Sequence, residues 1–171
     1  MVNADNNLYN EFLEIVEDLI YTPEFRKLDE CSHHYGVSRM QHCINVAYYS
    51  FVVCKKLKLD YVAAARAGLL HDLFYYDWQG SGLGVAKHAF LHSSIALENA
   101  EQLTELSPLE RDIIKNHMWL CGKMWPRHRE SYIVSVADKV CAVWEAGYGV
   151  KCKVALSLIH ISEPTRLALI S

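Results

Sequence analysis

Apolar residues recur at the spacing of an α-helix along almost the whole chain, and the alternating pattern of a half-buried strand is absent. One such stripe consists of Leu8, Phe12, Ile15 and Leu19. Start signals support the pattern, since Ser38 suits an N-cap and Ser107 to Glu110 form a capping box with Pro108 at the first helical position. We predict an all-α bundle with a short helix after Thr22-Pro23 and longer helices over residues 7–20, 38–56, 60–76, 88–103, 108–119 and 130–146.

The segment from Ser38 to Lys56 is apolar on most of its sides. Its two stripes are Met40, Ile44, Ala47 and Phe51, and His42, Val46, Tyr49 and Val53. A helix with this pattern is usually surrounded by other elements. We therefore expect this helix to be central and buried.

Bulk properties exclude several classes of protein. A chain of 171 residues is the size of one domain, and it buries roughly 70% of its unfolded surface without needing disulfides. The net charge of −3 does not indicate a nucleic-acid-binding surface. No apolar run is long enough to span a bilayer, the first ten residues do not resemble a signal peptide, and the six cysteines lack metal-binding spacing. We expect a cytoplasmic protein.

The C-terminal segment has an unusual sequence. Residues 156–166 read LSLIHISEPTR, which resembles the translation of an adapter used in preparing sequencing libraries. We expect residues 1–155 to form the domain and residues 156–171 to be a tail foreign to it. The alternative is a genuine short strand or helix end.

Polar side chains interrupt the apolar stripes at several positions. Asp138 lies in the segment 132–144, where Lys139 is the only other charged residue. His71-Asp72 lies in a similar apolar run. Further histidines continue apolar stripes in three other helices: His42, His92 and His117. A carboxylate buried in such a place must be paired, protonated or bound to a metal.

Each of these residues also has an ordinary structural explanation. A single histidine can be a hydrogen-bonded core residue, and Asp138 could pair with Arg66 or Arg39. Four inward histidines and two inward carboxylates on five helices are harder to satisfy by unrelated local bonds. One metal centre satisfies them together, because imidazole and carboxylate are ligands of divalent metal ions.

The order of these residues resembles the HD superfamily of phosphohydrolases. The elements are His42, then His71-Asp72 within LLHDL, then Asp138 within SVADKVCAV, and the resemblance covers residues 34–144. HDLFYYDW, HAFLHSSIALENA and IIKNHMW are also similar to a group of small bacterial HD-domain proteins. The chain departs from many HD enzymes after the HD pair, where Phe74 and Tyr75 or Tyr76 replace a glycine and a phosphate-contacting lysine.

The resemblance implies a metal-binding site. It implies that His42, His71, Asp72 and Asp138 hold one divalent ion, which could be Mn, Fe, Co, Ni, Zn or Mg. His92 and His117 match the positions that hold a second ion in two-metal members, with Asp72 as the bridge. A site with one ion remains the alternative. His128 is left out of the ligand set, whereas His88 could be a third ligand, a substrate contact, or a capping or surface histidine.

The expected activity is hydrolysis of a phosphate ester or anhydride in a small molecule, a nucleotide. Asp72 would orient a metal-activated water, and Lys139 and Arg39 would contact phosphate. Lys87 and Lys115 are weaker candidates for that contact. Two alternatives remain, a di-iron oxygenase of the same superfamily and a non-catalytic nucleotide-binding module. We expect no nucleic-acid or membrane partner, and the sequence does not indicate an oligomeric state.

Overall fold

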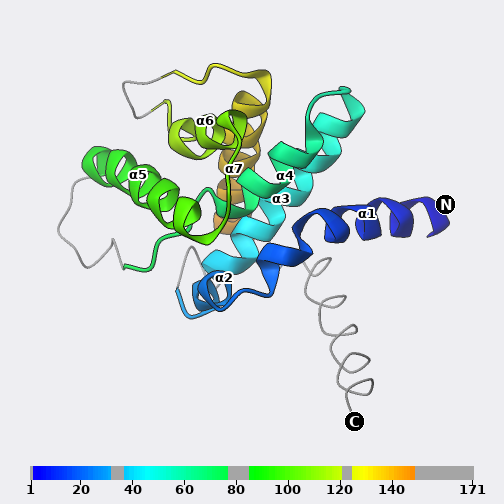
Figure 1. Cartoon of the computed structure of the whole chain (residues 1–171), viewed down its shortest axis with the longest axis horizontal. Coiled ribbons are helices and arrows are strands. Elements are labelled where there is room, and N and C mark those ends of the chain that lie inside the picture. Colours follow the sequence, from blue (N-terminus) through cyan, green and yellow to red (C-terminus); the bar gives the residue numbers. More distant parts are fainter. Residues whose placement is uncertain (1, 32–36, 77–84, 121–124, 149–171) are drawn as a thin grey trace, which may run out of the picture.

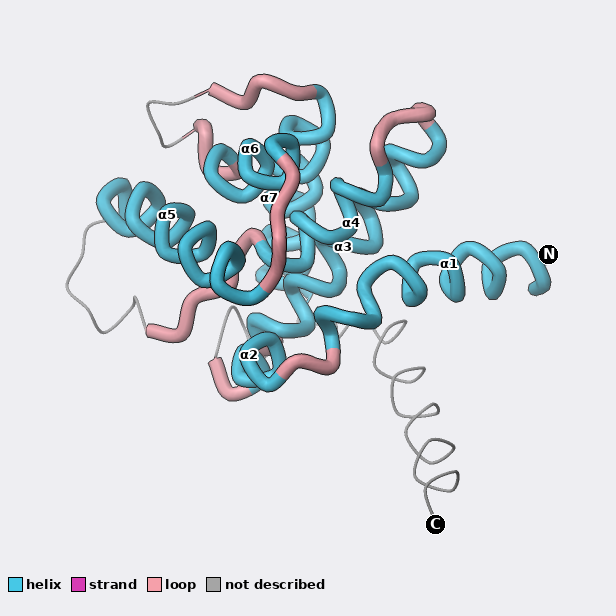
Figure 2. The backbone as a smooth tube through the Cα atoms, viewed as in Figure 1, coloured by secondary structure: helices cyan, strands magenta, loops and turns pink. Residues whose placement is uncertain are grey.

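A computed structural model of the chain describes residues 2–31, 37–76, 85–120 and 125–148. The predicted tail over residues 156–171 and most of the segment between the helices predicted over residues 60–76 and 88–103 lie outside the described residues. The all-α fold is confirmed (Figure 1, Figure 2). The elements are α1 (Val2–Ile20), α2 (Pro23–Arg26), the 3-10 turn η1 (Lys27–Asp29), α3 (Arg39–Lys56), α4 (Tyr61–Leu70), α5 (Val85–Leu103), α6 (Pro108–Asn116) and α7 (Arg129–Tyr148).

Side-chain caps explain where several helices begin. Ser38 accepts a hydrogen bond from the backbone N–H of Gln41 at 3.2 Å, as the sequence predicts for the start of α3. The capping box of α6 is complete. Ser107 accepts from the Glu110 N–H at 3.2 Å, and the Glu110 carboxylate accepts from the Ser107 N–H at 2.7 Å.

Helix α3 lies at the centre of the bundle and packs against α4 and α7 (Figure 1). On its α1 side, the Phe12 ring contacts Tyr48 and Phe51 with ring centroids 5.3 and 5.7 Å apart. Against α4, a Cβ atom on Gly68 would lie 3.0 Å from the Cα of Ala47. The two helices therefore approach closely where α4 has no side chain, one turn before the His71-Asp72 pair.

Two sequence-based expectations about these helices are wrong. Helix α4 ends at Leu70 rather than continuing to Tyr76, because the chain turns at the HD pair, with Phe74 N–H donating to the Asp72 carbonyl at 2.8 Å. The second stripe of α3 is buried only in its first half, since Tyr49 and Val53 are 47% and 41% exposed. Within the described ranges, every helix is too short or too polar to cross a bilayer.

Candidate metal centre

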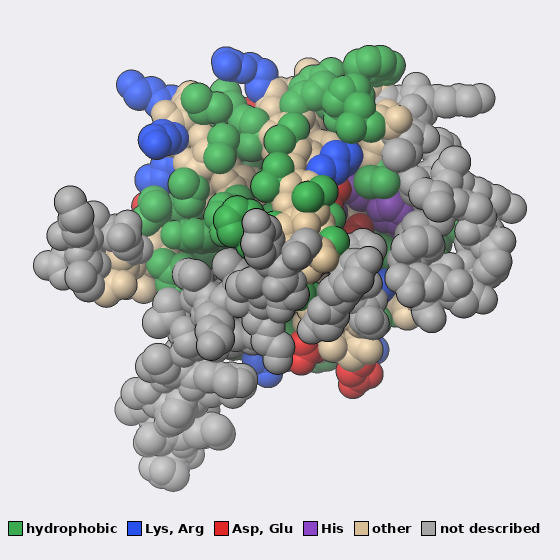
Figure 3. Space-filling model, turned by 180° about the vertical axis from the view of Figure 1, so that it is seen from behind, with side chains coloured by type: hydrophobic (Ala, Val, Ile, Leu, Met, Phe, Trp, Pro, Cys, Tyr) green, Lys and Arg blue, Asp and Glu red, His purple; other side chains and the backbone are tan. Residues whose placement is uncertain are grey.

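Six of the residues singled out in the sequence converge in the interior of the bundle. Three of them lie within α3, α5 and α7, and the other three lie just after the ends of α4 and α6. Each of the six is buried. His71 and Asp72 follow α4, and His117 follows α6. On one face of the molecule, histidine and acidic side chains reach the surface together beside a basic side chain (Figure 3). The six residues are His42, His71, Asp72, His92, His117 and Asp138.

One half of the cluster surrounds Asp138. Its Oδ1 lies 3.2 Å from His42 Nε2 and 3.8 Å from His71 Nε2. Ligand atoms of these three residues lie within 4.8 Å of one another. Two neighbouring ligands of one ion at bond lengths near 2.1 Å are about 3–3.5 Å apart. The spacing around Asp138 is thus close to that of a coordination sphere.

The other half surrounds Asp72, whose two carboxylate oxygens face different histidines. Oδ2 lies 3.8 Å from His71 Nε2. Oδ1 lies 3.4 Å from His92 Nε2 and 3.6 Å from His117 Nε2, and these two nitrogens are 2.9 Å apart. A carboxylate in this position can bind two ions at once, one through each oxygen.

Backbone carbonyls fix the orientation of two of the rings. His71 Nδ1 donates to the carbonyl of Gly68, and His117 Nδ1 donates to the carbonyl of Ile114, both at 2.8 Å. A carbonyl oxygen can only accept, so in each neutral ring the proton is on Nδ1 and the lone pair is on Nε2. That lone pair points into the cluster, as required of a metal-binding imidazole.

The third ring, His42, is held by a carboxylate that the sequence reasoning missed. Glu145 Oε2 lies 2.8 Å from His42 Nδ1, and Glu145 is only 3% exposed. Its other oxygen accepts from Asn45 at 3.0 Å, and Asn45 in turn accepts from Gln41 at 2.9 Å. Glu145 lies seven residues after Asp138, on the same face of α7. This seven-residue spacing is the signal in the sequence that could have identified Glu145 as part of the site.

The residues present fit a divalent metal. His71 Nε2 is buried and has no hydrogen-bond partner in the part of the chain that the structure describes. Leaving such an atom unsatisfied costs about 1–3 kcal/mol. Four imidazoles and two carboxylates are also suitable ligands for manganese, iron, cobalt, nickel or zinc. A bound ion would give His71 Nε2 a partner and would be held by the imidazoles and carboxylates of the cluster.

The buried groups of the cluster perturb one another's pKa values strongly. Burial alone would lower the pKa of His42, but hydrogen bonds with Asp138 and Glu145 raise it to about 10. Burial, together with the neighbouring His71 and His92, lowers the pKa of His117 to about 3. Burial alone would raise the pKa of Asp138, but contacts with His42 and His71 hold it well below its usual range. The cluster is therefore a network of charged and neutral groups in close contact.

The two predicted phosphate contacts lie in different surroundings. Lys139 Nζ is at the edge of the cluster, 3.4 Å from Asp138 Oδ2, where it donates to the His117 carbonyl at 3.0 Å. Arg39 is 1% exposed, donates to the Phe74 carbonyl at 2.6 Å and stacks on the Phe74 ring. Contact of either residue with phosphate stays a prediction.

The alternative partners suggested for Asp138 bind elsewhere. Arg66 pairs with Asp18 at 2.8 Å and with Glu110 at 3.2 Å, and Arg39 contacts Phe74. Of the two weaker phosphate candidates, the structure places only Lys115. Lys115 lines a separate pocket, and the side chain of Lys87 lies outside the described part of the chain, as does that of His88.

Comparison with known proteins gives a family and a relative. The family model described as "HD domain" matches residues 39–143. Ribonuclease Y of Syntrophomonas wolfei subsp. wolfei is 28% identical over 109 residues, which are 63% of this chain and 19% of that protein. The matched part thus covers about a fifth of the length of that curated relative. No solved structure shows significant similarity.

Proposed function

Since the chain belongs to the HD domain family, a superfamily of metal-dependent phosphohydrolases, we propose that it hydrolyses a phosphate ester or anhydride of a small molecule, a nucleotide. The proposal rests on one observation above all. The oxygens of Asp72 face two groups of histidines, with Oδ2 toward His71 and Oδ1 toward His92 and His117. This arrangement suits two-metal hydrolysis of phosphate esters.

Two sets of residues would hold the metal ions. His42, His71 and Asp138, together with Asp72, would bind one ion. Asp72, His92 and His117 would bind the second. When bound, the metal supplies Lewis acidity that activates water and neutralises charge on the phosphoryl group.

The chain's own side chains would complete the reaction site. The carboxylate of Asp72, between the two groups of ligands, would orient the water that attacks phosphorus. The ammonium of Lys139 at the edge of the cluster would contact a phosphate oxygen. Its hydrogen bonds to the His117 carbonyl and to Ser135 Oγ hold it in place. The buried rings would exclude bulk water from the rest of the site.

A second candidate function follows from the same ligand set. Four histidines and two aspartates also suit two iron ions, and we keep the di-iron oxygenase as the alternative enzyme. The two reactions differ in what they consume and release. Hydrolysis releases phosphate or a phosphorylated product and needs no oxygen.

The test is a panel of substrates with purified protein. Nucleotides, phosphomonoesters and a short RNA are incubated with Mn, Co, Ni, Mg, Fe or Zn, and phosphate release, phosphorylated products and oxygen consumption are measured. The RNA is included because the similar protein is a ribonuclease by name. We expect metal-dependent release of phosphate from a nucleotide. Asp72→Ala is expected to abolish this activity, and Asp29→Ala, an exposed control, is expected to leave it intact. Oxygen consumption without hydrolysis would favour the oxygenase instead.

A further inference from the structure

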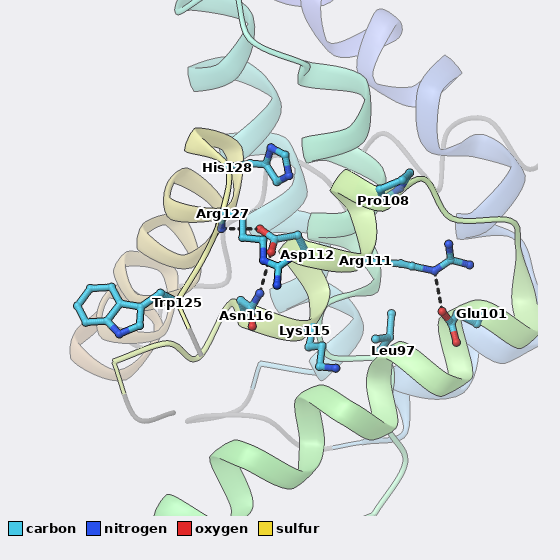
Figure 4. A pocket seen from close by; sticks show the side chains of 10 residues that line it. All are labelled: Leu97, Glu101, Pro108, Arg111, Asp112, Lys115, Asn116, Trp125, Arg127 and His128. Carbon is cyan, nitrogen blue, oxygen red and sulfur yellow. Dashed lines mark hydrogen bonds and ion pairs between the residues drawn. The ribbon is translucent and has the colours of Figure 1, made fainter. Parts of the chain in front are cut away.

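A pocket of the molecule is lined by residues other than those of the metal centre. A pocket of about 610 Å³ opens between α5, α6 and residues 125–128 (Figure 4). Its volume is within the range of pockets that bind small molecules. None of the six clustered histidines and aspartates lines it. Any ligand of this pocket would therefore be bound by other residues than those of the proposed reaction site.

The two carboxylates of the pocket are already engaged. Glu101 pairs with Arg111 at 2.7 Å. Asp112 accepts hydrogen bonds from the backbone N–H of Arg127 at 3.0 Å, from Ser131 Oγ at 2.6 Å and from Asn116 Nδ2 at 2.8 Å. These bonds tie residues 125–128 and the start of α7 to α6, so the wall of the pocket is fixed in place.

The remaining charges of the pocket are positive. Lys115 and Arg127 are exposed side chains that line it, and neither forms an ion pair with an acidic residue in the ranges that the structure describes. In Figure 4 both lie between Trp125 at one end and the Arg111–Glu101 pair at the other. Arginine and lysine are the two side chains that proteins most often use to bind phosphate.

An aromatic side chain, Trp125, lines one end of the same pocket. Trp125 is 67% exposed, and one side of its ring packs against Trp119, with ring centroids 5.0 Å apart. Trp119 in turn contacts the ring of Tyr132 at 5.5 Å. Trp125 is thus supported from behind while most of its surface is open to solvent. An exposed, supported indole is suited to stacking on a flat heteroaromatic ring.

We propose that this pocket binds a nucleoside phosphate at a site distinct from the metal centre. Trp125 stacks on the base, and Lys115 and Arg127 bind the phosphate. The inference goes beyond the proposed hydrolase activity and does not depend on it, because it uses different residues and requires no metal.

The experiment measures binding of adenosine 5′-monophosphate by calorimetry and by tryptophan fluorescence, with chelator present. Adenosine and inorganic phosphate are separate arms. The protein variants are Trp125→Ala, Lys115→Ala with Arg127→Ala, and Lys56→Ala as an exposed control lysine. The Asp72→Ala variant removes the proposed metal centre and tells the two sites apart.

The pocket variants are expected to weaken binding about tenfold or more, while Lys56→Ala and Asp72→Ala leave it unchanged. Adenosine alone and phosphate alone are expected to bind more weakly than the monophosphate. The proposal is overturned if wild-type protein does not bind the monophosphate, if Asp72→Ala alone abolishes binding, or if the pocket variants bind normally. Phosphate binding as tightly as the monophosphate would overturn the role of Trp125.

Discussion

Glu145 Oε2 lies 2.8 Å from His42 Nδ1 and connects the last turn of α7 to the first turn of α3. This contact turns the opposite nitrogen, Nε2, toward Asp138 at 3.2 Å. Carboxylates in this position orient metal-binding imidazoles and increase their basicity. Asn45 holds the second oxygen of Glu145, so the carboxylate has little freedom to rotate.

The first prediction follows from this contact. Glu145→Gln retains an oxygen that can accept from His42 but loses the negative charge, so we expect affinity for Mn²⁺ or Zn²⁺ to fall about 10–100-fold. Titration calorimetry measures the affinity, and thermal unfolding shows whether the fold is retained. Glu105→Gln, at an exposed position, is the control. Unchanged affinity in Glu145→Gln would mean that His42 does not bind the ion through Nε2.

The second prediction concerns the number of ions. His92 Nε2 lies 3.4 Å from Asp72 Oδ1 and 2.9 Å from His117 Nε2, on the Asp72 side of the cluster. We therefore expect two ions per chain in the wild type and one in His92→Ala, counted by elemental analysis against protein concentration. A single ion in both proteins would establish the mononuclear site.

The third prediction concerns the packing of α4 on α3. A Cβ atom at position 68 would lie 3.0 Å from the Ala47 Cα, which is backbone and cannot move aside easily. We expect Gly68→Val to lower the free energy of unfolding by about 1–3 kcal/mol, measured by chemical denaturation. Val62→Ala, at an exposed position of the same helix, serves as control. Equal stabilities of Gly68→Val and the wild type would show that the helices can separate there.

Local signals predicted the fold well. The caps at Ser38 and Ser107 could be predicted because they depend on a few neighbouring residues. The end of α4 could not be predicted from the sequence. The apolar run continues past His71, and the turn there depends on backbone hydrogen bonds that the spacing of apolar residues does not indicate. Tyr49 was wrongly assigned to the core because an apolar residue at helical spacing can also lie on the surface.

The site was predictable only where a polar residue interrupts an apolar stripe. Asp138 and His71 stand out for that reason, and the structure brings them within 3.8 Å. Glu145 does not stand out, because it lies near the end of α7, where a glutamate is commonly exposed. The pocket beside Trp125 combines residues from separate segments whose proximity only the folded chain creates. Metal binding by the cluster itself stays a prediction.

The most direct test is a crystal structure of the protein with Mn²⁺, using anomalous scattering to locate the ion. The account predicts a strong peak among the Nε2 atoms of His42 and His71 and the carboxylates of Asp72 and Asp138, at about 2.0–2.3 Å from each ligand atom. It predicts no such peak in Asp72→Ala. Fully occupied manganese elsewhere on the chain, with these side chains unliganded, would contradict it.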